Sequence, residues 1–327
     1  METKIASVTM VGHFPHGLDL HVRNLKWFLE ATDYHIYIIT LPRVLEHIDI
    51  SSERVSLITR PTPHDAFTEN AAGFVNFWRW FPAIIEHYQI DPEWFLLMEQ
   101  DLWFFERFDS VPETDTVKTF FSEKGNYHSV MLGDRVLQPH LWEGTHLINA
   151  AIIKRAIDFK VDFGYRATSF LDRHREHYER LFGDKLSISM WAGPETLTEF
   201  SLYCALEERV GWCEAETAVH LQGPELLHRK YPLLYQGYDE SLLERARREV
   251  PYIDVYAALA AYYIAGNWND VTPVKWENAG PGLRNDLRKV APRAREWMSP
   301  QQHSRFLEVI DSLDRAPRTG ASREVAF

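Results

Sequence analysis

A short apolar run, Trp-Phe-Leu-Leu-Met at residues 94–98, leads directly into Glu99-Gln100-Asp101. A short continuous apolar run that ends at polar residues is typical of a strand buried on both faces of a sheet. The acidic triplet then lies at the carboxyl end of that strand. The same pattern, an apolar run that ends at polar residues or proline, occurs three times earlier in the chain. This recurrence predicts the fold.

Three further apolar runs precede it and are typical of strands, at residues 5–12, 35–41 and 55–60. Apolar residues with helical spacing lie between them, at residues 18–31 and 71–88, and Pro82 is expected to kink or split the second helix. Alternating strands and helices predict an α/β fold, a mostly parallel mixed sheet flanked by helices. Ligands bind beyond the carboxyl ends of such strands. We therefore expect the loops after residues 12, 41, 60 and 98 to share one edge.

The chain after residue 105 is less regular. Residues 129–132 and 145–153 are expected to form strands or a transition from strand to helix. Helices are expected at residues 161–181, 195–210, 252–264 and 289–313. Residues 315–327 have no apolar periodicity and are expected to form a flexible tail.

Composition excludes several classes of protein. The chain has 327 residues, 45% apolar and 25% charged, which is ordinary for a globular protein. Its net charge of −12 argues against a nucleic-acid partner. Two cysteines are too few for a disulfide scaffold. We see no signal peptide and no stretch of roughly 18 apolar residues, so a soluble, cytoplasmic protein is expected.

Glu99 and Asp101 flank a single residue at a strand end, where both carboxylates can face the same edge. Carboxylate oxygens suit Mg²⁺ or Mn²⁺, which also accept phosphate oxygens as ligands. With 47 acidic residues in the chain, an acidic-x-acidic triplet is expected by chance roughly seven times. Its position between two apolar segments is less common, because a buried carboxylate without a partner is costly. A helix cap or an ion pair with arginine is the alternative.

The segment Phe-Leu-Leu-Met-Glu-Gln-Asp resembles the strand and DXD element of the GT-A glycosyltransferases, although Glu99 replaces the first aspartate. The resemblance implies a GT-A-like fold, with Asp101 and Glu99 binding Mn²⁺ or Mg²⁺ and Gln100 contacting the nucleotide. It also implies a GT-A-like catalytic domain at residues 1–240, with a nucleotide half to about residue 105 and an acceptor half after it. A helical extension would occupy residues 241–314.

A second segment, His220-Leu-Gln-Gly223-Pro, is similar to the His-x-x-Gly element of some GT-A families. That similarity implies that His220 is a further metal ligand and that Gly223 lets the backbone approach the phosphates. Lys230 comes later than the family spacing and is a candidate phosphate contact. The alternative for His220 is an ordinary surface or core histidine.

Glu195 and Glu199 lie at the start of the helix expected at residues 195–210, four residues apart on one face. Stabilisation by the helix dipole would explain a carboxylate there. In GT-A enzymes an acid at the start of a comparable helix contacts a sugar or acts as the base. Transfer requires a base, because the acceptor hydroxyl loses its proton as the bond forms. Glu195 and Glu199 are therefore the candidate catalytic residues, Glu195 first.

The strand-end argument adds candidate contacts to the nucleotide: His13, Phe14, Thr40 and Arg60. Arg79, in the helix before residue 94, is a further candidate, with a solvated or ion-paired arginine as the alternative. Candidate acceptor contacts are Trp142, Glu143 and Trp191. Core packing is the alternative for the two tryptophans.

The expected function is transfer of a sugar from a nucleotide-diphosphate donor, a UDP-sugar, to an unknown saccharide, lipid-linked or small-molecule acceptor. A non-catalytic module that binds UDP and metal is an alternative. A sugar nucleotidyltransferase is another, but it needs a glycine-rich, arginine-containing loop after the first strand, and residues 12–17 contain two glycines and no arginine. A Rossmann dehydrogenase is disfavoured because no GxGxxG follows that strand.

Overall fold

The computed structural model describes the main elements of the chain between residues 4 and 220. The described ranges are 4–11, 18–40, 52–59, 81–98, 102–113, 117–122, 128–132, 135–139, 145–163, 167–182, 186–190, 199–213 and 217–220, with isolated residues at 45, 50, 100, 245, 248–250 and between 288 and 311. The chain divides into two compact units, residues 1–221 with 235–251, and residues 222–234 with 252–327. The elements below belong to the first unit.

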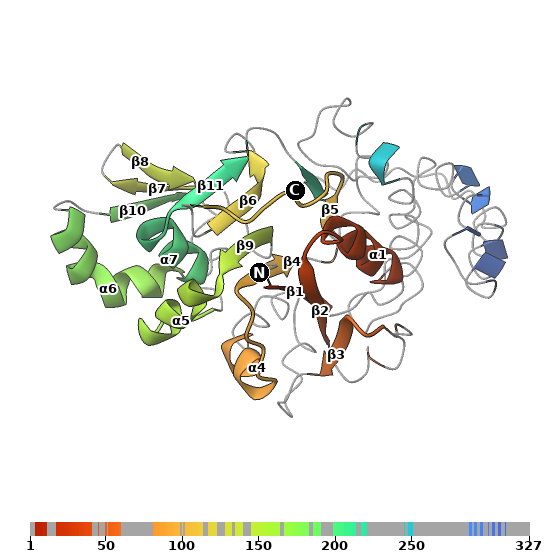
Figure 1. Ribbon diagram of the computed structural model, residues 1–327. Coiled ribbons are helices and arrows are strands. Elements are labelled where there is room, and N and C mark those ends of the chain that lie inside the picture. The colour runs from red at the N-terminus through yellow and green to blue at the C-terminus, as the bar shows by residue number, and fades with distance from the viewer. Residues whose placement is uncertain are drawn as a thin grey trace. The chain divides into compact units, whose positions relative to one another are not determined.

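The described residues form twelve strands and five helices, most of which are labelled in Figure 1. The strands are β1 (Lys4–Val11), β2 (Asp33–Thr40), β3 (Val55–Thr59), β4 (Trp94–Met98), β5 (Leu102–Phe104), β6 (Val117–Ser122), β7 (His128–Leu132), β8 (Arg135–Pro139), β9 (Thr145–Asn149), β10 (Leu186–Met190), β11 (Val210–Cys213) and β12 (Ala218–His220). The helices are α1 (Leu18–Phe28), α4 (Phe81–His87), α5 (Ala150–Asp158), α6 (Ala167–Phe182) and α7 (Glu199–Glu207).

The main sheet has seven strands in the order β11-β6-β9-β4-β1-β2-β3. The pairs among β1, β2, β3 and β4 are parallel, as is β11 with β6. Only β9 runs the other way, because it is antiparallel to both neighbours, β4 and β6. The predicted fold class, a mostly parallel mixed sheet flanked by helices, is therefore confirmed.

Two smaller sheets accompany the main one. One has the order β10-β7-β8, and the other is the antiparallel pair β12-β5. Thr217 joins that pair to the main sheet, because its N–H donates to the Phe120 carbonyl of β6 and its carbonyl accepts from the Phe105 N–H. The position of β5 is thus tied to that of β6.

Consecutive residues of the central strands are buried, which explains their unbroken apolar sequence. All five residues of β4 are buried, and so are Ile5, Ala6, Ser7, Val8 and Thr9 in β1. A strand buried on both sides has its two faces covered. The helices α1, α4, α5, α6 and α7 each contribute side chains to the same core as these strands.

Two helices end at residues with a left-handed backbone. Gln89 after α4 has φ of 52° and Lys160 after α5 has φ of 58°. In each case the next residue donates its N–H to a carbonyl five residues earlier, at 2.9 Å from Ile90 to Ile85 and 3.0 Å from Val161 to Ala156. This is the Schellman arrangement, which ends a helix and redirects the chain.

Two predicted boundaries were wrong. The helix expected at residues 161–181 begins at Ala167, because Val161 still belongs to the turn that closes α5. The helix expected at residues 195–210 ends at Glu207, and Val210 begins β11, where it pairs with Val117. Both errors extended a helical pattern into residues that hydrogen bond outside the helix.

Other boundaries agree with the predictions. Residues 145–153 form the expected transition, in which Asn149 ends β9 and caps α5 by accepting from the Ala151 N–H at 3.0 Å. The helix expected at residues 71–88 is seen as α4, with Pro82 in its first turn, where proline is tolerated. The part of that helix before Phe81 and the helix expected at 252–264 lie outside the described residues. The domain boundary at 240 stays a prediction.

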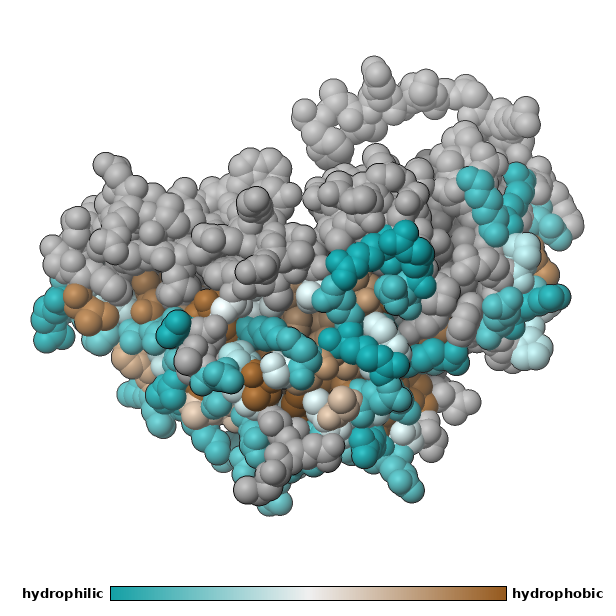
Figure 2. Space-filling model, turned by 45° about the horizontal axis from the view of Figure 1, so that its top comes forward, coloured by the Kyte–Doolittle hydropathy of each residue, from teal (hydrophilic) through white to brown (hydrophobic). Residues whose placement is uncertain are grey.

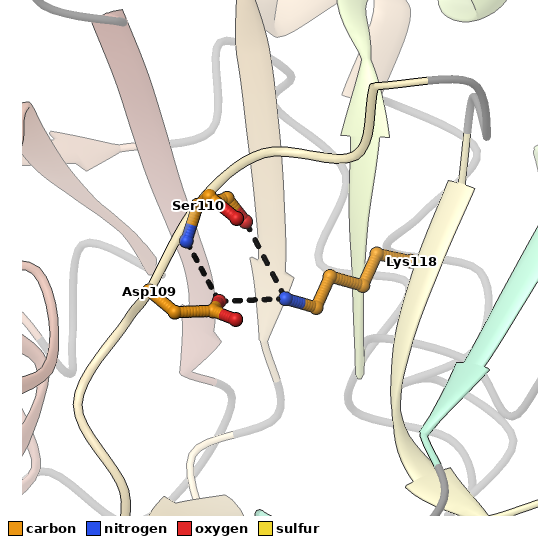
Figure 3. A network of polar contacts seen from close by, with 3 residues as sticks. All are labelled: Asp109, Ser110 and Lys118. Carbon is orange, nitrogen blue, oxygen red and sulfur yellow. Dashed lines mark hydrogen bonds and ion pairs between the residues drawn. The ribbon is translucent and has the colours of Figure 1, made fainter.

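The segment after β5, residues 105–113, is fastened to the sheet by polar contacts. Lys118 of β6 donates to the Asp109 carboxylate at 2.8 Å and to the Ser110 carbonyl at 3.4 Å (Figure 3). Partial burial alone would raise the pKa of Asp109, but the hydrogen bonds from Lys118 and from the Ser110 N–H hold it below its ordinary value. The segment 105–113 is therefore fixed to β6.

The described surface mixes polar and apolar residues. Figure 2 shows hydrophobic and hydrophilic residues side by side on one face. Among the described residues, the large apolar ones that are exposed are far apart in the sequence: Tyr88, Ile157, Leu181 and Leu307. Among the described residues, no helix has both the length and the apolar character needed to span a bilayer.

Candidate functional site

The strand ends form one continuous edge. Val11 of β1 pairs with Thr40 of β2, and Thr40 pairs with Thr59 of β3. On the other side of β1, Thr9 pairs with Met98 of β4. The predicted edge is thus confirmed for the ends of the first four strands. In the sequence, His13 and Phe14 come two and three residues after the end of β1, and Arg60 comes directly after β3.

The acidic triplet lies between two strands that belong to different sheets. Glu99 follows the last residue of β4, and Asp101 precedes the first residue of β5. Gln100 between them is in a turn and is half-buried. The triplet is therefore the connection between the main sheet and the pair β12-β5.

The same two-stranded sheet carries the candidate histidine. In its register Ala218 pairs with Phe104, Val219 with Trp103, and His220 with Leu102. His220 thus lies directly across from the residue that follows Asp101. Two segments predicted separately to bind a metal are neighbours in the fold.

The antiparallel strand β9 brings a third segment to this edge. Its first residue, Thr145, pairs with Met98, the last residue of β4. Since β9 runs against β4, its beginning lies where the parallel strands end. Trp142 and Glu143 precede Thr145 in the chain by three and two residues, and Thr145 itself pairs with the residue before Glu99.

Buried polar side chains line the sheet behind the edge. The Thr40 hydroxyl donates to the Val11 carbonyl at 2.7 Å and so ties the ends of β1 and β2. Thr9 and His21 are both buried, with 3.1 Å between the Thr9 Oγ1 and the His21 Nε2. His146 of β9 is buried as well, opposite Leu97 and Thr119. Buried polar groups in folded proteins are generally hydrogen-bonded.

Sequence reasoning missed one group of side chains, those of α1 that face β5. His21, Asn24 and Phe28 have helical spacing (i, i+3, i+7) and all three are buried. Two polar residues on the buried face of an apolar helix were the available signal. Asn24 is hydrogen-bonded to both backbone groups of Phe104.

Glu199 is buried in a network of its own. Its side chain is 2% exposed and is ion-paired with Arg173. The same carboxylate oxygen accepts from the Asp162 N–H at 2.7 Å. These contacts join α6, α7 and the segment after α5, and they give the carboxylate a structural role; a catalytic role for Glu199 stays a prediction.

The other candidate residues lie outside the described part of the chain. They are His13, Phe14, Arg60, Arg79, Glu99, Asp101, Trp142, Glu143, Trp191, Glu195, Gly223 and Lys230, and of His220 only the backbone is described. The described side chains include no cluster of three or more His, Cys, Asp or Glu that could hold a metal ion. The candidate site is thus located by the ends of β1 to β4 and by the register of β5 with β12.

Comparisons with known proteins add a distant structural likeness. No family model matches the sequence, and no curated protein matches it. A solved structure that the fold resembles is that of the galactosyltransferase LgtC in complex with donor and acceptor sugar analogs. The two chains are 9% identical, with a TM-score of 0.41, over 73% of this chain and 99% of that chain.

Proposed function

We propose that the protein is a metal-dependent glycosyltransferase of the GT-A type, which moves a sugar from a UDP-sugar to an acceptor hydroxyl. The whole sequence also resembles majastridin, a bacterial protein of this type, and that resemblance is part of the proposal. The observation that carries it is the register of β5 with β12, in which His220 pairs with Leu102, next to Asp101.

The register supports a shared metal site through covalent geometry. Consecutive Cα atoms are about 3.8 Å apart, and facing Cα atoms of antiparallel strands are about 4.5–5.5 Å apart. Because Asp101 is bonded to Leu102, its Cα lies within about 9 Å of that of His220. An aspartate and a histidine at this separation fit one divalent ion. Carboxylate and imidazole ligands suit Mn²⁺, with Mg²⁺ as the alternative, and Glu99 is the third candidate ligand.

The proposed roles follow the order of the segments along the edge. The bound metal would offset charge on the diphosphate. His13, Phe14, Thr40 and Arg60, at or after the ends of β1, β2 and β3, would surround the base and ribose. Further proposed nucleotide contacts are Arg79, Gln100, Gly223 and Lys230.

The acceptor would enter from the side of β9. Trp142 and Glu143 belong to the segment that leads into Thr145, and Trp191 follows β10 directly. Glu195 is the proposed base, which takes the proton of the acceptor hydroxyl. We place it ahead of Glu199 because the Glu199 carboxylate is already occupied by Arg173 and the Asp162 N–H.

Metal-dependent nucleotide binding tests the first half of the proposal. A thermal-shift series with UDP, GDP and ADP, each with and without Mn²⁺, should give the largest stabilisation for UDP with Mn²⁺. A ligand at 100 times its Kd stabilises the folded protein by about 2.7 kcal/mol. Asp101→Ala and His220→Ala should lose this shift, whereas Asp109→Ala and His177→Ala, matched changes at residues without a proposed metal role, should keep it. An unchanged shift in Asp101→Ala would contradict the metal site.

Turnover separates an enzyme from a binding module. UDP-sugars incubated with Mn²⁺ and protein should release UDP slowly by hydrolysis, and faster with a suitable acceptor. Glu195→Gln should reduce this rate by about 10²–10⁴-fold and leave the Kd for UDP unchanged. Binding of UDP and Mn²⁺ with no release of sugar from any donor would favour the non-catalytic alternative.

A further inference from the structure

The strand β5 has two edges, and each is satisfied in a different way. One edge pairs with β12. On the other, the Asn24 side-chain amide of α1 takes the place of a neighbouring strand. It donates to the Phe104 carbonyl at 2.8 Å and accepts from the Phe104 N–H at 2.9 Å.

An asparagine side chain suits this position because its amide is chemically a peptide group. It offers one carbonyl acceptor and N–H donors in one plane, as a strand backbone does. Asn24 is 1% exposed, so water does not compete for these bonds. The N–H and the C=O of Phe104 belong to a buried residue, and both are hydrogen-bonded to this one side chain.

Two more side chains of α1 contact β5 on the same helix face. His21 contacts the Trp103 ring edge-on, with centroids 5.9 Å apart, and Phe28 stacks on Phe104 at 3.6 Å. His21 also contacts Thr9 of β1. The helix α1 therefore contacts β5 through three residues, and through His21 it also contacts β1 of the main sheet.

We propose that Asn24 is a positioning residue for the proposed metal site, and that it acts by holding β5 in the register in which His220 pairs with Leu102, the residue that follows Asp101 in the chain. The proposal rests on the proposed function. Asn24 contacts neither metal nor nucleotide. It fixes Phe104, the last residue of a three-residue strand whose other edge pairs with β12.

The same geometry gives α1 a second consequence. The helix begins at Leu18, so it follows the segment that holds the candidate nucleotide contacts His13 and Phe14. One helix therefore follows the segment of the nucleotide candidates in the chain and contacts the strand that follows Asp101.

The test measures Mn²⁺ affinity directly, from the EPR signal of free Mn²⁺ at saturating UDP. The variants are Asn24→Leu, which removes both hydrogen bonds at similar volume, and Asn24→Asp, which keeps the acceptor for the Phe104 N–H. We expect the Kd for Mn²⁺ to rise by about 10–100-fold in Asn24→Leu and by less in Asn24→Asp, the range seen when the support of a metal ligand is removed.

A matched control separates positioning from general stability. Arg155→Met removes the bond to the buried Glu208 carboxylate, at 2.6 Å, between α5 and the end of α7. It should lower the Tm without changing the Kd for Mn²⁺. If Asn24→Leu lowers only the Tm and keeps the wild-type Kd, Asn24 is merely structural and the proposal is overturned. If neither Asn24 variant folds, its role is not local to β5, and the proposal is equally overturned.

The wild type and Asp101→Ala distinguish the two proposals. A wild type that binds no Mn²⁺ in the presence of UDP refutes the proposed function, and the role of Asn24 falls with it. A wild type that binds Mn²⁺, together with an Asp101→Ala variant that does not, supports the proposed function. Under that result, wild-type affinity in both Asn24 variants refutes the positioning role alone.

Discussion

Three phenylalanines around β5 offer a test of how the aromatic core is packed. Phe104 stacks on Phe28 with centroids 3.6 Å apart and planes at 5°. It meets Phe120 edge-on, with centroids 4.8 Å apart and planes at 81°. All three rings are buried. The perturbation is leucine at each position, singly and in the pairs 28/104 and 104/120.

The two contacts should differ in strength. Ring pairs contribute about 0.5–1.5 kcal/mol beyond area burial, and edge-to-face or offset pairs are preferred to a face-to-face stack. A centroid separation of 3.6 Å between parallel planes leaves little room for an offset, so the Phe28–Phe104 coupling should be near 0.5 kcal/mol. The edge-on Phe104–Phe120 coupling should be about 1–1.5 kcal/mol. Phe104→Leu removes both ring contacts and should therefore cost more than Phe28→Leu or Phe120→Leu, by at least about 0.5 kcal/mol.

Urea unfolding followed by tryptophan fluorescence gives the free energies for both double-mutant cycles. Phe163→Leu combined with Phe104→Leu is the control, because the ring contacts of Phe163 are with Phe81 and Phe200. That pair should be additive within about 0.5 kcal/mol. A stacked pair that couples more strongly than the edge-on pair would refute the reasoning.

Three further predictions concern stability. Lys160→Gly should stabilise the protein by about 0.5–1 kcal/mol in urea unfolding, since φ is 58° there, whereas Lys160→Ala should change it little. Lys118→Met should cost no more than about 0.5 kcal/mol at pH 7, because the Asp109 side chain is 74% exposed; the lowered pKa of Asp109 means that this cost disappears as the pH falls below about 3.8 and the carboxylate is protonated. Burial and the neighbouring Arg173 lower the pKa of His174, so the wild type should lose stability as the pH falls below about 6.5, where the unfolded chain takes up the proton first. His174→Leu should show a smaller loss between pH 7 and pH 5 in urea midpoints, and an equal loss would contradict the assignment.

The central strands were predictable because each is a continuous apolar run that ends at polar residues or proline. The strand predicted at residues 94–98 is β4, with the same bounds. β1, β2 and β3 agree with the predictions to within one or two residues. Their shared edge then followed from the rule for parallel sheets, without any knowledge of side-chain contacts.

The short strands were not predictable in the same way. β5 and β12 have three residues each, and what makes them strands is a partner far away in the sequence. The three apolar residues of β5 by themselves fit a helix, a strand or a loop equally well. The contact of Asn24 was missed for the same reason. Its partner is the backbone of Phe104, and a sequence does not show which backbone groups a side chain will contact.

The reversed direction of β9 has a consequence for how such a protein can change. Both ends of the segment before Thr145 are anchored, by β8 at Pro139 and by the pairing of Thr145 with Met98. Chimeras that exchange residues 140–144 for longer segments should therefore still fold, because both anchors are kept. Under the proposed function, such chimeras should keep their affinity for UDP and Mn²⁺ and differ in the acceptors that they use.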